Sequence, residues 1–388
     1  MELLGMIRHY KKEIDDILRA VYDDHEDGGS DGDDLYVTSL RFYVLRKHGY
    51  AVPSGNISSD DVNTLLTLYD ATHLTVHGED ILDNIIAFNK SRLRSLMKTN
   101  LESDLLEEIR VTLETTLFRR VERVEARHFI SVYEKKATRD NTILEFAKLD
   151  YNLVQVVYCN KLKELTIWWK DLRSRVDLTF SRDRNVICCT DKVVEELKVK
   201  NNKHAEVVRE MALHVAKSYH AEVTWRDEHY VPADVDEHLQ ISLGSIAAMQ
   251  TVVLAFVSLG DVATREAIDW AMTYPDIVRG VTVIARIMND IMPHEREQAS
   301  DHMESTVQTC MKQYGVTVEE AIEKLNVIVE KAWMDMIQEC LDQKYPMLLL
   351  EKVVSFAQSI DFFYKSEDLY TLPWNLKDTL TSMYAKFI

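Results

Sequence analysis

Residues 140–170, DNTILEFAKLDYNLVQVVYCNKLKELTIWWK, decide the fold class of this chain. Apolar residues recur in this stretch at the spacing of a helix. They are Leu149, Leu153, Val156, Val157, Leu162, Leu165 and Trp169. The chain around the stretch has no glycine from 79 to 243 and no proline from 54 to 231. A β-rich domain needs turns within such a length, so we predict an all-α protein in which these apolar residues pack against other helices.

Helical periodicity extends through the rest of the sequence. It predicts further helices at about 3–22, 35–48, 79–96, 103–117, 125–135, 191–225, 234–257, 262–273, 276–292, 301–313, 317–342, 346–365 and 375–386. Residues 23–34 are acidic and glycine-rich, so we expect a surface connection there. Ser58-Ser-Asp-Asp61 supplies candidate N-cap residues for another helix.

Length and charge limit the classes of function. The chain has 388 residues, enough for two domains, and a formal net charge of −18 at pH 7. Nucleic acids and anionic membranes attract clustered Lys and Arg, which this sequence does not show. We therefore expect no nucleic-acid partner and no membrane partner, and an anionic ligand would need a local basic patch or a metal ion.

The cysteine content predicts a reducing compartment. The five cysteines are Cys159, Cys188, Cys189, Cys310 and Cys340. They form no CxxC pair and no Cys/His metal-binding spacing, and their odd number argues against a disulfide framework. The N-terminal residues lead directly into an amphipathic pattern, without a transit-type or membrane-spanning stretch. These features predict a cytoplasmic protein with reduced thiols.

The most informative functional pattern is Arg286-Ile-Met-Asn-Asp-Ile-Met-Pro-His-Glu-Arg-Glu297. On a continuous helix, Asn289, Pro293 and Glu297 share one face and Arg286 lies one turn earlier. Oxygen ligands at this spacing suit Mg²⁺, which often completes its coordination with substrate phosphates. A neighbouring guanidinium would bind the same phosphates. The same spacing is also typical of a solvated helix face, so the pattern alone does not decide between the two.

Several further motifs occur in order along almost the whole chain. They are Ser39–Tyr50 (SLRFYVLRKHGY), His77–Asp83 (HGEDILD), Glu125–Glu134 (EARHFISVYE), Phe146–Asn152 (FAKLDYN), Trp168–Asp171 (WWKD), Arg182-Asp-Arg184, and Trp225 with Tyr230-Val-Pro232. Together with the Arg286–Glu297 segment, they resemble the plant terpene synthases, most closely the monocot sesquiterpene type.

The resemblance implies two helical domains and a reaction. We expect an N-terminal relic helical domain at 1–136 and a truncated class I terpene synthase, metal-binding domain at 137–388. The implied activity is Mg²⁺-dependent ionisation and cyclisation of farnesyl diphosphate to a sesquiterpene, with release of diphosphate. Mn²⁺ is an alternative cofactor.

The resemblance also assigns candidate roles to single residues. Arg182, Arg184 and Arg286 match diphosphate-binding arginines, Asn289 and Glu297 match metal ligands, and Asp368 and Tyr370 match an acid and a tyrosine that line the pocket. The remaining match is Gly244-Ser245, which resembles a break in a pocket helix. Without the resemblance, the charged residues would be interpreted as surface salt bridges, Asp368 and Tyr370 as an ordinary helix end, and Gly244 as a packing glycine.

Two departures from the family pattern bear on activity. The sequence passes from Arg184 directly into what resembles the far side of the metal region, so a deletion near 185–190 removes the Asp-Asp-x-x-Asp motif. A literal match at Asp23–Asp27 lies in the acidic N-terminal connection, where we do not expect the metal site. Pro293 replaces the hydroxyl residue of the second metal motif, which removes one ligand and a helix hydrogen bond.

These departures predict a chain with little or no activity, since an entire ligand cluster and part of the pocket are missing. Missing helices would also expose the apolar faces of their neighbours, which favours aggregation or a dimer. We expect a monomer or a homodimer. An alternative function is a non-catalytic helical partner of a full-length homologue, and a trans-prenyltransferase is a weaker alternative because it needs two aspartate-rich clusters.

Overall fold

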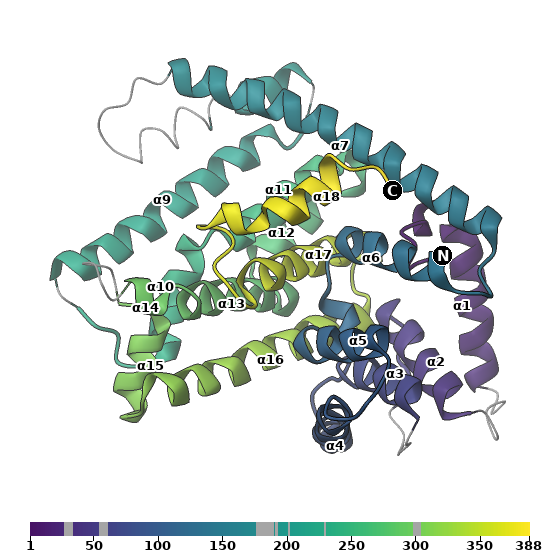
Figure 1. Cartoon of the computed structure of the whole chain (residues 1–388). Helices are drawn as coiled ribbons and strands as arrows, with labels where there is room; N and C mark the ends of the chain where they lie inside the picture. Colours follow the sequence, from purple (N-terminus) through teal and green to yellow (C-terminus); the bar gives the residue numbers. More distant parts are fainter. Residues whose placement is uncertain are drawn as a thin grey trace. The chain divides into compact units, whose positions relative to one another are not determined.

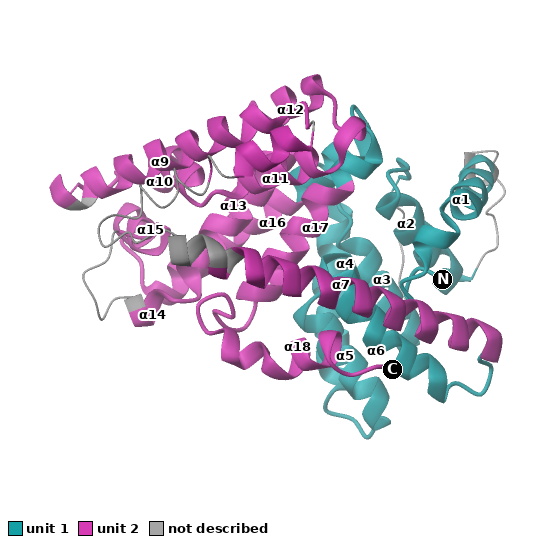
Figure 2. Ribbon diagram, turned by 90° about the horizontal axis from the view of Figure 1, so that it is seen from above, with its two compact units in different colours: residues 1–139, 334–350 teal, residues 140–333, 351–388 magenta. Residues whose placement is uncertain are grey.

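The structure is a computed structural model that describes residues 1–26, 34–53, 61–175, 190, 193–200, 202–228, 230–297 and 304–388. Every regular element within these ranges is a helix (Figure 1), so the all-α prediction is confirmed. The chain divides into two compact units (Figure 2). The first comprises Met1–Arg139 and Met334–Leu350, and the second comprises Asp140–Trp333 and Glu351–Ile388.

The first unit is built from short helices. They are η1 (Ile7–His9), α1 (Lys11–Glu26), α2 (Leu35–Lys47), α3 (Val62–Thr72), α4 (Asp80–Leu96), α5 (Ser103–Glu114), η2 (Leu117–Arg119) and α6 (Glu122–Lys135). The helix predicted to start near residue 3 begins later, because Gly5 adopts a left-handed φ of 72° and only a 3-10 turn follows before α1. The predicted N-cap of α3 is confirmed, since the Asp61 carboxylate accepts the backbone N–H of Thr64 at 2.8 Å.

The second unit surrounds the buried helix α13. Its elements are α7 (Asn141–Arg175), α9 (Ala205–Glu228), α10 (Val235–Ser245), α11 (Ala248–Ser258), η3 (Gly260–Val262), α12 (Arg265–Met272), α13 (Asp276–Ile291), α14 (His294–Glu297), α15 (Thr306–Tyr314), η4 (Pro373–Leu376) and α18 (Lys377–Tyr384). Helices α16 (Val318–Asp342) and α17 (Met347–Tyr364) contribute residues to both units. Helix α13 packs against α10, α11 and α15, so its side chains are held by the core of this unit.

The helix predicted at 191–225 is interrupted. Residues 193–199 are helical, but a turn precedes α9. The side chain of Asn202 accepts the backbone N–H of His204 at 2.9 Å, and this local bond competes with helix continuation.

The helix predicted at 234–257 divides into α10 and α11. The break lies at Ile246–Ala247, where Ala247 adopts an uncommon left-handed φ of 60°. Gly244 lies just before the break, inside α10. The whole stretch Val235–Ser258 is long and apolar enough to cross a membrane, yet 61% of its most apolar window is buried inside the protein. We therefore interpret it as core.

Gly244 is required for the close approach of α10 to α9. A Cβ at this position would lie 2.2 Å from Ser218 Oγ and 2.9 Å from Ser218 Cβ. We expect Gly244→Ala to lower the free energy of unfolding by about 1–3 kcal/mol in urea titrations. Ser218→Gly removes the atoms with which the new methyl group would clash. The loss of unfolding free energy in the double variant should therefore be smaller, by at least about 1 kcal/mol, than the sum of the losses in the two single variants. Additive losses would contradict this contact.

The apolar residues of α7 are not packed as predicted. They are exposed, namely Leu149 (67%), Leu153 (62%), Val156 (44%), Val157 (43%), Leu162 (51%) and Leu165 (60%). Helix α18 covers one face of α7, where Gln155 Nε2 donates to the carbonyl of Met383 and Cys159 Sγ donates to that of Tyr384, both at 2.9 Å. The side chain of Trp169 lies outside the description. The core assignment is wrong because α7 is apolar on several sides and α18 covers one of them.

Candidate functional site

The C-terminal end of α13 carries the candidate site. Arg286, Asn289 and Asp290 are spaced i, i+3 and i+4, so they lie on one side of the helix. Arg286 forms an ion pair with Asp290, whose side chain is 1% exposed, and Arg286 Nη2 donates to Asn289 Oδ1 at 3.3 Å. Asp290 also accepts the backbone N–H of Thr306, the first residue of α15, at 2.8 Å. The structure thus brings Arg286 and Asn289 together, and the ion pair with Asp290 holds the guanidinium of Arg286 in place.

Pro293 separates Asn289 from Glu297. The backbone N–H of Met292 still bonds to the carbonyl of Met288 at 3.2 Å, but Pro293 has no N–H to continue the series. Helix α13 ends at Ile291, and α14 is a separate four-residue segment. The helix predicted at 276–292 is confirmed as α13, and the single face that a continuous helix would give Asn289, Pro293 and Glu297 does not form, because α13 ends before Pro293.

Glu222 on α9 is a site residue that the sequence did not reveal. Its side chain is 7% exposed and lies 3.9 Å from Arg286 Nη1. Ser245 Oγ, at the end of α10, donates to Glu222 Oε1 at 2.6 Å. Burial raises the pKa of Glu222, although the charge of Arg286 and the Ser245 hydrogen bond oppose the rise. Arg286 therefore lies between two carboxylates, those of Glu222 and Asp290.

A second group of side chains surrounds Tyr364 at the end of α17. Asn289 Nδ2 donates to the Tyr364 hydroxyl at 3.0 Å. Burial raises the pKa of Tyr364, and the hydrogen bond from Asn289 opposes this. Because one amide contacts both Arg286 and Tyr364, Asn289 is held in a single orientation between the two groups.

Asp368 is buried, whereas Tyr370 is exposed. The Asp368 carboxylate, 3% exposed, accepts from Arg296 Nη2 at 2.5 Å and from the backbone N–H of Thr371 at 3.0 Å. Burial raises the pKa of Asp368, but these hydrogen bonds outweigh it and hold the pKa below its ordinary value. Tyr370 is 72% exposed, with its ring edge-on to Phe363. Arg296 was not among the predicted site residues.

Three predicted site residues lie wholly or partly outside the described part of the chain. Arg182 and Arg184 lie outside the described residues, as does the side chain of Glu297. The deletion expected near 185–190 falls within the same gap in the description. Their predicted roles stay predictions.

The described side chains do not fit a divalent metal site. In the part of the chain that the structure describes, no group of three or more His, Cys, Asp or Glu side chains is placed to hold a metal ion. Asn289 Oδ1 faces the guanidinium of Arg286, and Asp290 is shared between Arg286 and the backbone of Thr306. These oxygens accept hydrogen bonds from protein groups. A Mg²⁺ site instead needs several oxygen atoms directed toward one common position.

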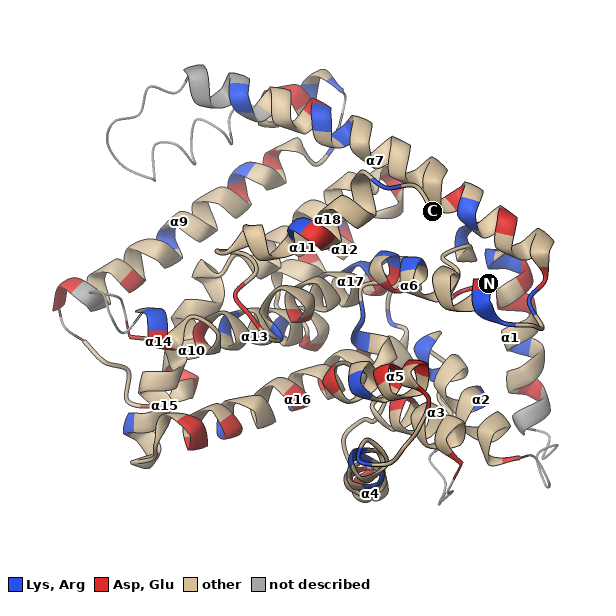
Figure 3. Cartoon of the chain, viewed as in Figure 1, with Lys and Arg blue, Asp and Glu red and all other residues tan. Residues whose placement is uncertain are grey.

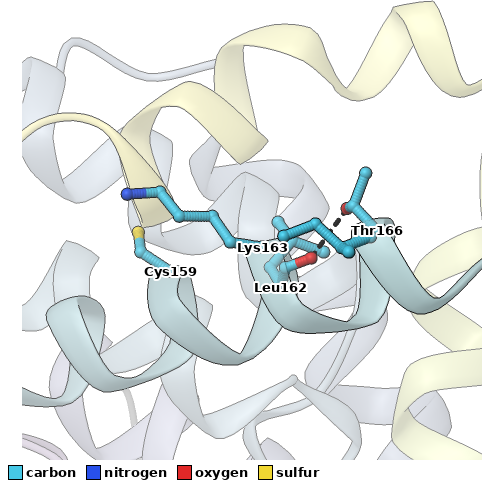
Figure 4. A pocket seen from close by; sticks show the side chains of 5 residues that line it. Cys159, Leu162, Lys163 and Thr166 are labelled. Atoms are coloured by element: carbon cyan, nitrogen blue, oxygen red, sulfur yellow. Dashed lines mark hydrogen bonds between the residues drawn. The ribbon is translucent and has the colours of Figure 1, made fainter. Parts of the chain in front are cut away.

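A hollow on α7 is lined by residues that are distant in sequence from the candidate site. Cys159, Leu162, Lys163, Thr166 and Ile167 line it, all from successive turns of one helix (Figure 4). A ligand pocket usually encloses its ligand between walls from several elements, with a few polar groups aimed inward. We therefore interpret the hollow as part of the exposed apolar surface of α7.

Comparison with known proteins identifies the family. The profile described as "Terpene synthase, N-terminal domain" matches residues 1–113, and the profile described as "Terpene synthase family, metal binding domain" matches residues 184–335. The (E)-beta-caryophyllene synthase of Zea mays is 41% identical, over 100% of this chain and 86% of the relative. The chain belongs to the terpene synthase family. The beta-sesquiphellandrene synthase of Sorghum bicolor is 34% identical, with the same shares covered.

Solved structures show the same terpene synthase fold. Isoprene synthase from grey poplar, in complex with three Mg²⁺ ions and dimethylallyl-S-thiolodiphosphate, has a TM-score of 0.86 at 23% identity. The comparison covers 100% of this chain and 91% of that one. A limonene synthase with 2-fluorolinalyl diphosphate has a TM-score of 0.87 at 20% identity, covering 100% and 89%. Both resemblances concern the fold alone.

This terpene synthase is shorter than the stretch of the maize relative that it matches. The comparison extends over 475 residues, whereas this chain has 388, so 475 − 388 = 87 aligned positions have no residue in this chain. The identity and coverage place the whole chain in the family, and the length difference bears on which parts of the family site it contains.

His238 on α10 offers a pH test of the site's surroundings. It is 2% exposed, and its Nδ1 lies 3.0 Å from Thr309 Oγ1. Burial, with the nearby charge of Arg286, lowers the pKa of His238 to about 3. Below about pH 6.5 the histidine binds a proton in the unfolded state but stays neutral in the folded state. The free energy of unfolding therefore decreases by about 1.4 kcal/mol for each pH unit by which the pH is lowered. We expect His238→Gln to flatten this loss in urea titrations between pH 7.5 and 5.

The control for this experiment is His220→Gln, because His220 is exposed on α9. This variant should retain the acid loss of stability seen in the unmodified protein. If His238→Gln and the unmodified protein lose stability in parallel as the pH falls, then His238 is not held neutral in the folded state.

Proposed function

We propose that this cytoplasmic terpene synthase is built to ionise farnesyl diphosphate and form a sesquiterpene with release of diphosphate, and that its present form is strongly impaired. The observation that carries the proposal is the ion pair of the partly buried Arg286 with the buried Asp290, beside Asn289 and inside the segment that matches the metal binding domain. The maize and sorghum relatives, named as caryophyllene and sesquiphellandrene synthases, support a sesquiterpene product.

Arg286 is the proposed binding group for the leaving diphosphate. Ionisation breaks the allylic carbon–oxygen bond, and the bonding electrons leave with the diphosphate while the prenyl chain becomes a carbocation. A guanidinium stabilises the developing charge on oxygen best when its position is fixed beforehand. Asp290 and Glu222 supply that fixed position here, and Asn289, oriented by Tyr364, places an amide beside it. The carboxylates also compete with the diphosphate for the same guanidinium.

Three observations support impairment. The maize comparison leaves 87 aligned positions (475 − 388) without a residue in this chain. Pro293 ends α13 before the proposed ligand Glu297. The described residues form no divalent metal site, whereas the isoprene synthase structure with a similar fold holds three Mg²⁺ ions. Mg²⁺, with Mn²⁺ as the alternative, remains the proposed cofactor of a complete site.

The activity prediction can be checked with farnesyl diphosphate, Mg²⁺ and the purified chain of verified mass. Loss of one well-placed electrostatic group commonly costs ~10²–10³ in rate, so we expect sesquiterpene formation at least ~10²-fold below that of the maize relative assayed in parallel. Volatiles are analysed against a metal-free control. Metal-dependent product at a rate similar to that of the relative would contradict the impairment.

A diphosphate-binding measurement tests whether the chain keeps the proposed binding site even when it forms no product. We expect the chain to bind inorganic diphosphate in isothermal titration, and Arg286→Gln to weaken this binding at least ~10-fold, as expected for loss of a charge-assisted bidentate contact. Arg279→Gln is the matched control, because Arg279 is an exposed arginine on the same helix. Equal binding by both variants would remove Arg286 from the site, and no binding by the unmodified chain would argue against the proposed function.

A further inference from the structure

The outer side of α7 carries a row of residues that is typical of a coiled-coil seam. The positions alternate by three and four residues, which is the spacing at which two helices pack along each other. We name the row the α7 seam, and it comprises Phe146, Leu149, Leu153, Val156, Asn160, Lys163 and Ile167. All seven side chains are exposed, and Leu149, Leu153 and Ile167 are more than 60% exposed.

A neighbouring side of α7 is already occupied. Gln155 and Cys159 bond to the backbone of the α18 region, and Asn152 exchanges hydrogen bonds with the backbone of Ile388 at 2.9 and 3.2 Å. These residues lie about 100° around the helix from the middle of the α7 seam, so the α18 region covers a neighbouring side of α7. The helix is therefore held along that side while the seam stays exposed.

We propose that the α7 seam binds the same seam of a second copy of this chain, in an antiparallel, two-fold arrangement. The five apolar side chains of the seam are between 37% and 68% exposed, and exposed apolar surface of this kind becomes favourable when another surface covers it. A second copy presents an identical seam, and an isologous contact of this kind closes after two chains.

The order of residues along the seam fits an antiparallel pair. With the two-fold axis at Val156, Phe146 lies opposite Ile167 of the second copy and Leu149 lies opposite Lys163. The same axis places Leu153 opposite Asn160, whose polar side chain fixes the register of the pair. The alkyl stem of that lysine can lie on Leu149 while its ammonium group remains in water. In a parallel pair, Lys163 would instead lie directly opposite Lys163, and the like charges would repel.

The distribution of charge favours the same direction. Residues 141–150 contain two acids and one base, a net charge of −1, whereas residues 161–170 contain three lysines and one acid, a net charge of +2. The ten residues between them contain no charged side chain, and the middle of α7 is uncoloured by charge in Figure 3. Antiparallel packing places the negative end of each helix beside the positive end of the other, whereas parallel packing places the two positive ends together.

Sedimentation velocity between about 1 and 100 µM tests the dimer, since specific interfaces commonly dissociate at or below the micromolar range. We expect the mass to rise with concentration from that of one 45.0 kDa chain to twice that value. Leu153→Asp, at an exposed seam position, should keep the fold by circular dichroism and remain monomeric at 100 µM. Val327→Asp is the matched control, because Val327 is a 55% exposed apolar residue on α16 and its replacement should leave the dimer intact.

A photo-crosslinking amino acid at Phe146 tests the direction of the pair. In the antiparallel arrangement it should attach to residues near Ile167 of the second copy, and mass spectrometry of the linked peptides reads this directly. Attachment near Phe146 itself would overturn the antiparallel pair. An unmodified chain that is monomeric at 100 µM, a dimer that survives Leu153→Asp, or assembly only with the full-length maize relative would each overturn the proposal. These measurements do not depend on prenyl diphosphate chemistry.

Discussion

The ion pair between the partly buried Arg286 and the buried Asp290 links the helices around the candidate site of the second unit. Asp290 joins α13 to the start of α15 through the backbone of Thr306, and Arg286 joins α13 to Glu222 on α9. Glu222 in turn accepts from Ser245 at the end of α10. Removing a charge from water costs several kcal/mol, so each member of this set requires the others. The site is consequently a junction of four helices.

The sequence predicted the elements of this site better than their connections. Local signals were sufficient for α13 and for the Asp61 N-cap, because apolar period and capping chemistry act within a few residues. Glu222 could not be found in this way, since its role depends on α9 approaching α13 from a distant part of the chain. The interruption after Ile291 was partly foreseeable from Pro293, and the family resemblance suggested a helix break at Gly244-Ser245. The left-handed residue of that break is Ala247, directly before α11, and its position had no sequence signal of its own.

Helix α7 shows the limit of apolar periodicity as evidence. The pattern correctly indicates a long helix, and it identifies side chains that are more stable when removed from water. It does not indicate whether a partner for each face exists in the same chain. Leu149 and Leu162 lie on different sides of α7, as expected for a helix inside a bundle, yet both are more than half exposed. The assignment of these residues to the core assumed neighbours that the described residues do not supply.

The polar network and the apolar surface therefore have different consequences for this terpene synthase. The Arg286 network satisfies its own charges, so it stabilises the fold whether or not a diphosphate binds. A folded second unit is thus compatible with the loss of catalysis, and stability alone reports nothing about activity. The α7 seam has no such internal compensation, because exposed apolar area becomes favourable only when another surface covers it. The proposed pairing with a second copy would meet this requirement, and it depends on the exposed side chains of α7 rather than on the residues proposed to bind diphosphate.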